Sequence, residues 1–215
     1  DLWGDRKNKY DTLNKKDLKK TKFTRVEPEH PQYLFIPQDK GLASEYNNCW
    51  KITDIMQTNV LGFQSHRDKF AVAFDFQSMK DRIAHMRDTK IDDKRIVELF
   101  ELTEKKKWKI SDVRTKLREN DNWQKNIILC NYRPFDERYC YYSNVVMDRP
   151  RRELLQHVKG RENFCLNTVR QTKMATWQHA VVSKTPAPAV YVEMKDGSNI
   201  FPLYFYPSDD DLAHY

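Results

Sequence analysis

Glycine is scarce in this chain, with five residues among 215. Loops that cradle phosphates need glycines at fixed spacing, and the sequence contains neither a G-x-G-x-x-G segment nor a Walker loop. It also lacks an H-E-x-x-H segment and any Pro-Pro pair, which removes the Asn/Asp-Pro-Pro-aromatic turn of amino-methyltransferases. These absences predict a chain without nucleotide or methyl-donor chemistry of its own, with no catalytic residues and no metal ligands.

Cysteine pairs and long apolar runs are missing as well. Cys49, Cys130, Cys140 and Cys165 show no C-x-x-C spacing and lie in apolar or aromatic strings, which is typical of buried free thiols in a reducing compartment. No apolar run approaches the roughly 18 to 20 residues that span a bilayer, and no signal peptide opens the chain. We therefore expect a cytoplasmic protein with no membrane partner. Because the chain begins at Asp1 rather than Met, we also expect a piece of a longer protein.

Arginine is concentrated in one part of the chain. Seven of the fifteen arginines lie between Arg133 and Arg170, and residues 131–185 contain ten Lys or Arg against five Asp or Glu. The planar donor fork of arginine suits phosphates and guanine edges, and a basic region of this kind indicates a polyanionic partner. The alternative is that these arginines form carboxylate pairs inside the fold, with Arg133 paired to Asp136 and Arg149 to Asp148.

Hydrophobic spacing predicts an α+β fold. Between Asp75 and Arg118 three helical stripes recur, and Asp75, Asp92 or Asp93, and Ser111 can cap the helix starts. The apolar stripes are Phe76, Met79, Ile83 and Met86; Ile96, Leu99, Phe100 and Thr103; and Val113 and Leu117. After Asn122 the pattern predicts strands at 126–130, 138–142, 163–170, 176–182, 189–194 and 199–206, with one helix at about 150–159. We predict a mixed or antiparallel sheet preceded by an N-terminal helical portion.

Three segments make up the predicted organisation. Residues 1–50 are polar and lysine-rich, and we interpret them as a connector that leads in from an upstream domain and packs on the body. We predict that residues 51–122 form the helical portion and that residues 123–215 form a sheet-rich portion, whose basic region we expect to serve DNA recognition. We expect 51–215 and its connector to fold as one cooperative module.

Candidate DNA-binding side chains are basic or amide groups at turns, at a helix start and at strand ends. Arginines near the start of a helix add to its affinity for anions, and Arg and Gln are the side chains that read guanine and adenine through paired hydrogen bonds. The candidates are Arg67, Lys69, Arg133, Arg138, Arg149, Arg151, Arg152, Arg170, Gln171, Lys173, Gln178 and His179.

Two alternatives belong to other functional classes. Glu193-Met194-Lys195 forms an acid-x-Lys triplet on an expected strand, as in magnesium-dependent nucleases. Such a triplet arises often by chance in a chain that is 32% charged. The second alternative is a docking domain that binds no DNA.

Five segments in order carry a resemblance to a known family. They are the opening Asp1-Leu2-Trp3-Gly4-Asp5-Arg6-Lys7-Asn8-Lys9-Tyr10, then Ser65-His66-Arg67-Asp68, Tyr132-Arg133-Pro134-Phe135-Asp136 with Arg149-Pro150-Arg151, Arg170-Gln171, and Phe201-Pro202-Leu203-Tyr204-Phe205-Tyr206-Pro207. With this order, almost the whole chain resembles the C-terminal target-recognition (specificity) domain of type ISP restriction-modification enzymes and of similar single-chain restriction-methyltransferase proteins.

The resemblance implies a function for the chain and for its neighbours. In this family the domain follows an N6-adenine methyltransferase that uses S-adenosylmethionine, and type ISP members add a nuclease and an ATP-driven translocase. The chain would then recognise a short asymmetric sequence in double-stranded DNA and present the target adenine to the upstream methyltransferase domain. It would not be an enzyme by itself, and S-adenosylmethionine, ATP and magnesium would be used in the upstream domains. The resemblance does not indicate which bases are read.

Overall fold

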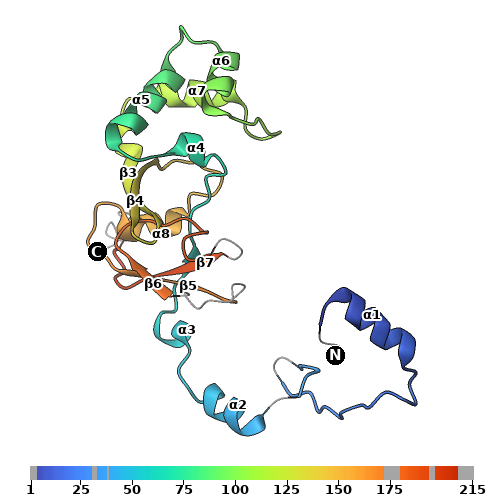
Figure 1. Cartoon of the computed structure of the whole chain (residues 1–215). Helices are drawn as coiled ribbons and strands as arrows, with labels where there is room; N and C mark the ends of the chain where they lie inside the picture. Colours follow the sequence, from blue (N-terminus) through green and yellow to red (C-terminus); the bar gives the residue numbers. More distant parts are fainter. Residues whose placement is uncertain (1–3, 31–32, 38, 172–179, 194–196, 208–215) are drawn as a thin grey trace. The chain divides into compact units, whose positions relative to one another are not determined.

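The computed structural model describes residues 4–30, 33–37, 39–171, 180–193 and 197–207 (Figure 1). The chain divides into a unit of residues 1–51 and a unit of residues 52–215. The first unit contains α1 (Arg6–Lys15), which begins where Asp5 accepts a hydrogen bond from the Asn8 backbone N–H, and α2 (Lys40–Asn47), which Asp39 caps. No described side chain of this unit is buried within it. That residues 1–50 connect a neighbouring domain to the body stays a prediction.

The second unit begins with its helical part. Its elements are α3 (Ile52–Ile55), β1 (Val60–Leu61), α4 (Asp68–Ala71), β2 (Val72–Ala73), α5 (Phe76–Arg87), α6 (Asp93–Phe100), α7 (Ile110–Glu119) and the 3-10 helix η1 (Trp123–Asn126). The predicted caps Asp75 and Asp92 are confirmed, since their carboxylates accept the backbone N–H groups of Ser78 and Arg95. Ser111 is wrong as a cap, because α7 begins at Ile110, whose N–H donates to Oε1 of Glu104 at 2.8 Å.

Most of the predicted helical stripes form the larger core. Side chains that are buried as expected are Met79, Ile83, Met86, Ile96, Val113 and Leu117. Phe76, at the start of α5, is 41% exposed, and in the second stripe Leu99 and Thr103 are exposed instead. The reason is that α6 ends at Phe100 and Glu101 takes a left-handed conformation, so the chain turns and buries Leu102 in their place.

Two antiparallel sheets follow, and they confirm the predicted α+β class. The strands are β3 (Ile127–Arg133), β4 (Asp136–Tyr141), β5 (Cys165–Val169), β6 (Ala180–Ser183) and β7 (Ser198–Pro202). One sheet has the order β2-β4-β3 and the other the order β1-β7-β5-β6. The strand predicted at 189–194 is wrong, because residues 189–193 form turns and bends, with the Tyr191 N–H bonded to the carbonyl of Pro188.

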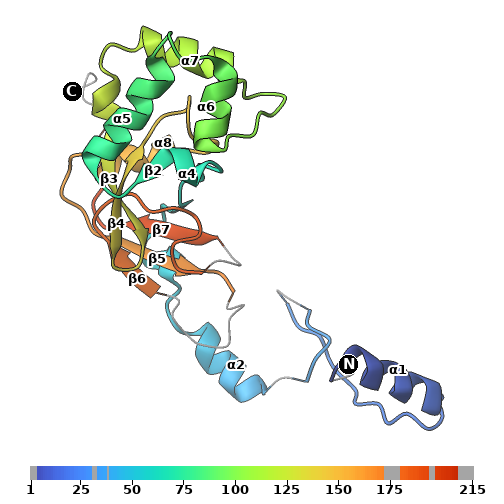
Figure 2. The same ribbon diagram turned by 45° about the horizontal axis from the view of Figure 1, so that its top comes forward.

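Helix α8 (Arg152–Val158) confirms the helix predicted near 150–159 and packs against both sheets. Leu155 contacts the small cluster that includes Phe63, Cys140 and Met147, whereas Leu154 and Val158 pack with Cys165 and Ile200 of the other sheet. Figure 2 shows α5, α6 and α7 gathered on the side of the β3–β4 sheet away from β5, β6 and β7. The second unit therefore places α8 and the loops around it between two small sheets.

The cysteines depart from the prediction at one position. Cys130, Cys140 and Cys165 are buried free thiols, and burial raises the pKa of Cys165 to about 12. Cys49 is exposed, so the expectation that all four are buried is wrong there. Among the described residues, no helix has the length and apolar character that crossing a membrane requires.

Candidate nucleic-acid interface

Four side chains at the β3–β4 hairpin form a stack in which aromatic rings alternate with guanidinium groups. Cζ of Arg138 lies 4.2 Å from the ring centre of Phe74 and 4.4 Å from that of Tyr132. Cζ of Arg133 lies 4.2 Å from the ring centre of Tyr132. Each such cation–π contact contributes about 0.5 to 1 kcal/mol at an exposed site. This arginine–aromatic stack (Phe74, Arg138, Tyr132 and Arg133) fixes the directions of two predicted DNA-binding arginines.

A hydrogen bond from Tyr132 connects this stack to the start of α4. Its hydroxyl donates a hydrogen bond of 2.8 Å to Oδ2 of Asp68, and Oδ1 of Asp68 accepts the hydroxyl of Ser65. Burial, followed by the hydrogen bond to Asp68, raises the pKa of Tyr132. The Ser65-His66-Arg67-Asp68 and Tyr132-Arg133-Pro134-Phe135-Asp136 segments, which are distant in sequence, thus meet at one place.

Arg67 lies inside the fold rather than on its surface. Its side chain stacks on Trp108, with Cζ 3.9 Å from the ring centre, and Nη1 donates to the carbonyls of Ser65 and Val146 at 3.0 Å each. Burial lowers the pKa of this guanidinium. With 8% of its surface exposed, Arg67 holds its loop against the helical part. The neighbouring candidate Lys69 is exposed and forms an ion pair with Glu101.

The two carboxylate pairs that the alternative reading names, Arg133 with Asp136 and Arg149 with Asp148, do not form. Asp136 pairs with Arg138 through Nε and Nη2 at 2.8 to 3.0 Å, not with Arg133. Alternate residues of a strand share a face, which brings positions 136 and 138 together. Asp148 pairs with Nδ1 of His66 at 2.8 Å, not with Arg149, because the backbones of Gln64 and Arg149 exchange two hydrogen bonds of 2.9 Å.

Most of the clustered arginines form no ion pair with a carboxylate of the described residues. Of the seven between Arg133 and Arg170, Arg138 is the one that forms an ion pair with another described residue. Arg149, Arg152, Arg161 and Arg170 are exposed, whereas Arg133 and Arg151 are half-buried. The described residues therefore do not support the alternative in which most of these arginines pair with carboxylates inside the fold.

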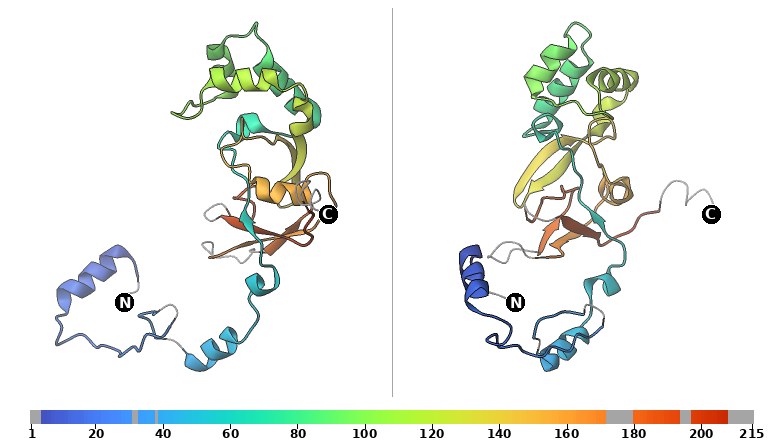
Figure 3. Two further views of the ribbon diagram at one scale, coloured as in Figure 1. Left: turned by 180° about the vertical axis from the view of Figure 1, so that it is seen from behind. Right: turned by 90° about the vertical axis from the view of Figure 1, so that its right-hand side faces the viewer.

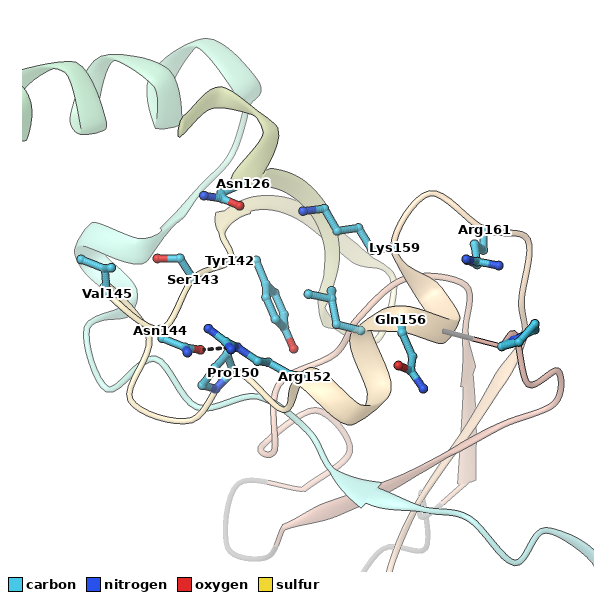
Figure 4. A pocket seen from close by; sticks show the side chains of 12 residues that line it. Asn126, Tyr142, Ser143, Asn144, Val145, Pro150, Arg152, Gln156, Lys159 and Arg161 are labelled. Carbon is cyan, nitrogen blue, oxygen red and sulfur yellow. Dashed lines mark hydrogen bonds between the residues drawn. The ribbon is translucent and has the colours of Figure 1, made fainter. Parts of the chain in front are cut away.

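A basic cavity of about 740 Å³ lies beside α8 (Figure 4). Its cationic side chains are Arg152, Lys159 and Arg161, and none of its twelve lining residues is acidic. Nε of Arg152 donates to Oδ1 of Asn144 at 3.0 Å, which orients the guanidinium at the cavity. Arg161 stacks on Tyr206 with Cζ 4.8 Å from the ring centre. Fixed cations beside neutral polar groups can hold a phosphate through charge-assisted hydrogen bonds.

Sequence reasoning missed two members of this cavity. Lys159 and Arg161 were not among the candidates, although Arg152, Gln156 and Lys159 follow the i, i+4, i+7 spacing of one helix face. That spacing was the available signal for Lys159. Arg161 comes after the helix, and its place at the cavity follows from its contact with Tyr206 near the end of the described chain.

The remaining candidates lie near the end of β5. Arg170 and Gln171 are exposed directly after this strand. Lys173, Gln178 and His179 lie outside the described residues. Of the possible nuclease pair, Glu193 is buried in the segment of turns and Lys195 lies outside the described residues. In the part of the chain that the structure describes, no group of His, Cys, Asp and Glu is suited to hold a metal ion.

Comparison with known proteins gives a family match and a shared fold. Residues 54–214 match the family described as the type ISP C-terminal specificity domain. A solved DrdV–DNA complex matches with a TM-score of 0.58 and 16% identity over 94% of this chain. A nuclease-deletion mutant of the type ISP restriction-modification enzyme LlaGI, in complex with a DNA substrate mimic, matches with a TM-score of 0.60 and 18% identity over 96% of this chain. The match spans 22% and 19% of those two longer chains. No curated protein matches the sequence.

Proposed function

Because this chain belongs to the family of type ISP C-terminal specificity domains, we propose that it recognises a short double-stranded DNA sequence within a larger restriction-modification enzyme. The DNA in the complexes of DrdV and LlaGI supports this proposal. One observation carries it: of the seven arginines between Arg133 and Arg170, six form no ion pair with a described residue. Charges that the fold leaves uncompensated are suited to a polyanion.

Phosphate contacts come from the basic cavity. Arg152, Lys159 and Arg161 line it without an acidic neighbour in its wall, and Arg152 is held in place by Asn144. Cations that contact backbone phosphates supply affinity that falls with salt and that does not depend on the base sequence. We assign these three side chains to phosphates, together with Arg133, Arg149 and Arg151. Arg67 supports the fold, since its guanidinium is bound to Trp108 and to two carbonyls.

Base reading is assigned to the segment that begins at the end of β5. Arg170 and Gln171 are exposed there. Arginine can donate two hydrogen bonds to the guanine O6 and N7 atoms, and glutamine can pair with N6 and N7 of adenine. We predict that Lys173, Gln178 and His179, which follow in the same segment of the sequence, also contact bases.

The chain performs no chemistry itself in this proposal. It presents a target adenine to an N6-adenine methyltransferase domain of the same polypeptide. S-adenosylmethionine, ATP and magnesium serve that domain and the nuclease or translocase domains. The proposed partners of this chain are therefore double-stranded DNA and the methyltransferase domain.

The test is selection of duplexes from a random pool by the 215-residue chain, joined to the methyltransferase domain where that domain is needed for binding. We expect one enriched motif that contains adenine. Gln171→Ala should change the enriched motif, whereas Arg152→Gln should weaken all sequences alike and reduce the slope of log affinity against log salt by about 1. Arg95→Gln is the matched control, because Arg95 is an exposed arginine of α6 that pairs with Glu98.

Three results would contradict the proposal. Binding that is weak and insensitive to salt, with no enriched motif, would indicate a docking domain. An equal effect of Arg95→Gln and Arg152→Gln would mean that the basic cavity has no special part in binding. Cleavage of the selected duplexes in the presence of magnesium, lost on Glu193→Gln, would indicate a nuclease instead.

A further inference from the structure

Phe135 occupies the tip of the β3–β4 hairpin, which Figure 3 shows in yellow. Its side chain has a relative exposure of 102%, so it contacts nothing that shields it within the described residues. Its φ is 64°, in the left-handed region. Proline at the second position of a turn and positive φ at the third is the pattern of a type II turn, whose third position favours Gly or Asn.

A phenylalanine here works against the stability of the chain on its own. The left-handed conformation is unfavourable for a bulky side chain. Full exposure means that the ring gains no burial energy in return, since hydrophobic stabilisation requires removal of apolar surface from water. Strained residues of this kind occur at functional sites. The contact of this ring is therefore expected outside the described part of the chain.

The surroundings of the ring favour DNA over a protein surface. Arg133, at the base of the turn, stacks on Tyr132 and forms no ion pair with a described residue. The charge of Asp136 is compensated by Arg138, and Glu137 lies on the opposite face of the strand, where Oε1 accepts from Nδ2 of Asn131. An uncompensated arginine next to an exposed aromatic ring suits a phosphate next to a base.

The hairpin also has the shape that this contact needs. Two-stranded β-ribbons bind in the major or the minor groove of B-DNA, and apolar side chains insert between base steps from the minor groove. Tyr132 is hydrogen-bonded to Asp68, and Arg138 is held by Asp136, Phe74 and Tyr132, so the base of the hairpin is fixed to the body. A fixed base allows the tip to push against stacked bases without bending away.

We propose that Phe135 is a wedge that stacks against a base of the bound duplex, with Arg133 on an adjacent phosphate. This inference rests on the proposed function, because it concerns the same bound DNA. Apolar side chains that insert between base steps partially unstack them and kink the duplex. The wedge would thereby loosen the stack at one step of the recognised sequence.

The experiment uses the selected duplex with 2-aminopurine placed at each position in turn. The unchanged chain should raise 2-aminopurine fluorescence at one step, because the base there loses its stacking neighbour. Phe135→Ala should abolish this rise and weaken binding about tenfold, while the enriched motif stays the same. Phe135→Trp should restore both signals. Phe35→Ala, which removes another exposed phenylalanine (81%), should match the unchanged chain.

The outcomes separate the wedge from the proposed function. Failure of the unchanged chain to enrich any motif would overturn the proposed function, and the wedge with it. If the unchanged chain enriches a motif but Phe135→Ala has the same affinity and the same 2-aminopurine fluorescence, the wedge alone would be wrong. If Phe135→Ala kept both DNA signals but lost binding to the methyltransferase domain, the tip would be a protein contact and the wedge would again be wrong. Unfolding curves of each variant confirm that the fold is intact.

Discussion

The hydroxyl of Tyr132 donates a 2.8 Å hydrogen bond to Oδ2 of Asp68, across 64 positions of the sequence. This contact fixes the position of the Tyr132 ring, on which Arg133 stacks and against which Arg138 lies. One hydrogen bond therefore determines where the base of the β3–β4 hairpin sits on the start of α4.

Tyr132→Phe removes this hydrogen bond and leaves the ring in place. We expect the free energy of unfolding to fall by about 1 to 2 kcal/mol, because Asp68 loses a partner in a half-buried setting. Urea titration followed by tryptophan fluorescence measures the change. Tyr46→Phe is the control, since Tyr46 is 79% exposed, and should change stability by less than about 0.5 kcal/mol. Equal stabilities of the two variants would show that the contact with Asp68 contributes nothing.

Phe135→Asn should make the fold more stable and the DNA complex weaker. Asparagine tolerates the left-handed conformation at φ 64°, so relief of strain should raise the free energy of unfolding by about 1 kcal/mol. Thermal unfolding and DNA titration on the same sample give both values. A variant that is less stable than the original chain would mean that the exposed ring has a packing role after all.

Gly62→Ala should destabilise the second unit strongly. A Cβ at this position would lie 2.4 Å from the carbonyl carbon of Pro188 and 2.6 Å from Ala189 N, and a backbone neighbour of this kind cannot move aside alone. We expect a loss of about 1 to 3 kcal/mol, as in overpacked interiors. Gly160→Ala is the comparison: its Cβ would meet nothing within 4 Å, so only the left-handed φ of 65° opposes the change, at about 1 kcal/mol. The two losses should therefore differ, and urea titration of both variants reveals whether they do.

Stability should depend on pH through His157. Its Nδ1 accepts the Tyr206 backbone N–H at 3.1 Å, and its pKa is lowered by burial first and by Arg161 second. A lowered pKa means that the unfolded chain binds this proton more readily than the folded chain does. The contribution of neutral His157 to the free energy of unfolding is therefore fully present above the usual histidine pKa of about 6.5, and it is lost as pH falls through the lower pKa of the folded state.

The matching measurement is the free energy of unfolding between about pH 5 and pH 7. We expect it to fall toward the acid end in the unchanged chain and in His85→Gln, which alters an exposed histidine. His157→Gln should flatten the dependence over this range. An unaltered slope in His157→Gln would assign the dependence to other groups.

Local chemistry explains which features of the fold could be predicted. Asp75 and Asp92 cap helices because the carboxylate of each reaches an N–H three residues ahead, and that relationship is visible in the sequence. The start of α7 was not predictable in this way, since Glu104 reaches Ile110 across a loop. Residues 189–194 carry the β-branched and aromatic residues of a strand, but their described part lies in turns, where Ala189 donates to Phe63.

The candidate site also combines features that could be predicted from the sequence with features that could not. The arginine concentration could be read directly, and the i, i+4, i+7 spacing of Arg152, Gln156 and Lys159, the last of them directly after α8, was also visible in the sequence. The partners of Asp136 and Asp148 could not be inferred from adjacency, because strand alternation decides the first and a distant histidine the second. Burial of Arg67 depends on Trp108, which lies 41 positions further along the chain and just before α7.

The pairing of β1 with β7 has a consequence for how specificity can change over time. The second unit enters its sheet at β1 (Val60–Leu61), and the last strand of its described part, β7, is the immediate neighbour, with Val60 opposite Ile200. A segment whose entry and exit strands lie side by side can be transplanted as a cassette, because the host chain needs only two adjacent attachment points. Exchange of the stretch from β1 to β7 between related chains would therefore transfer the clustered arginines and the β3–β4 hairpin together, and with them the proposed DNA preference.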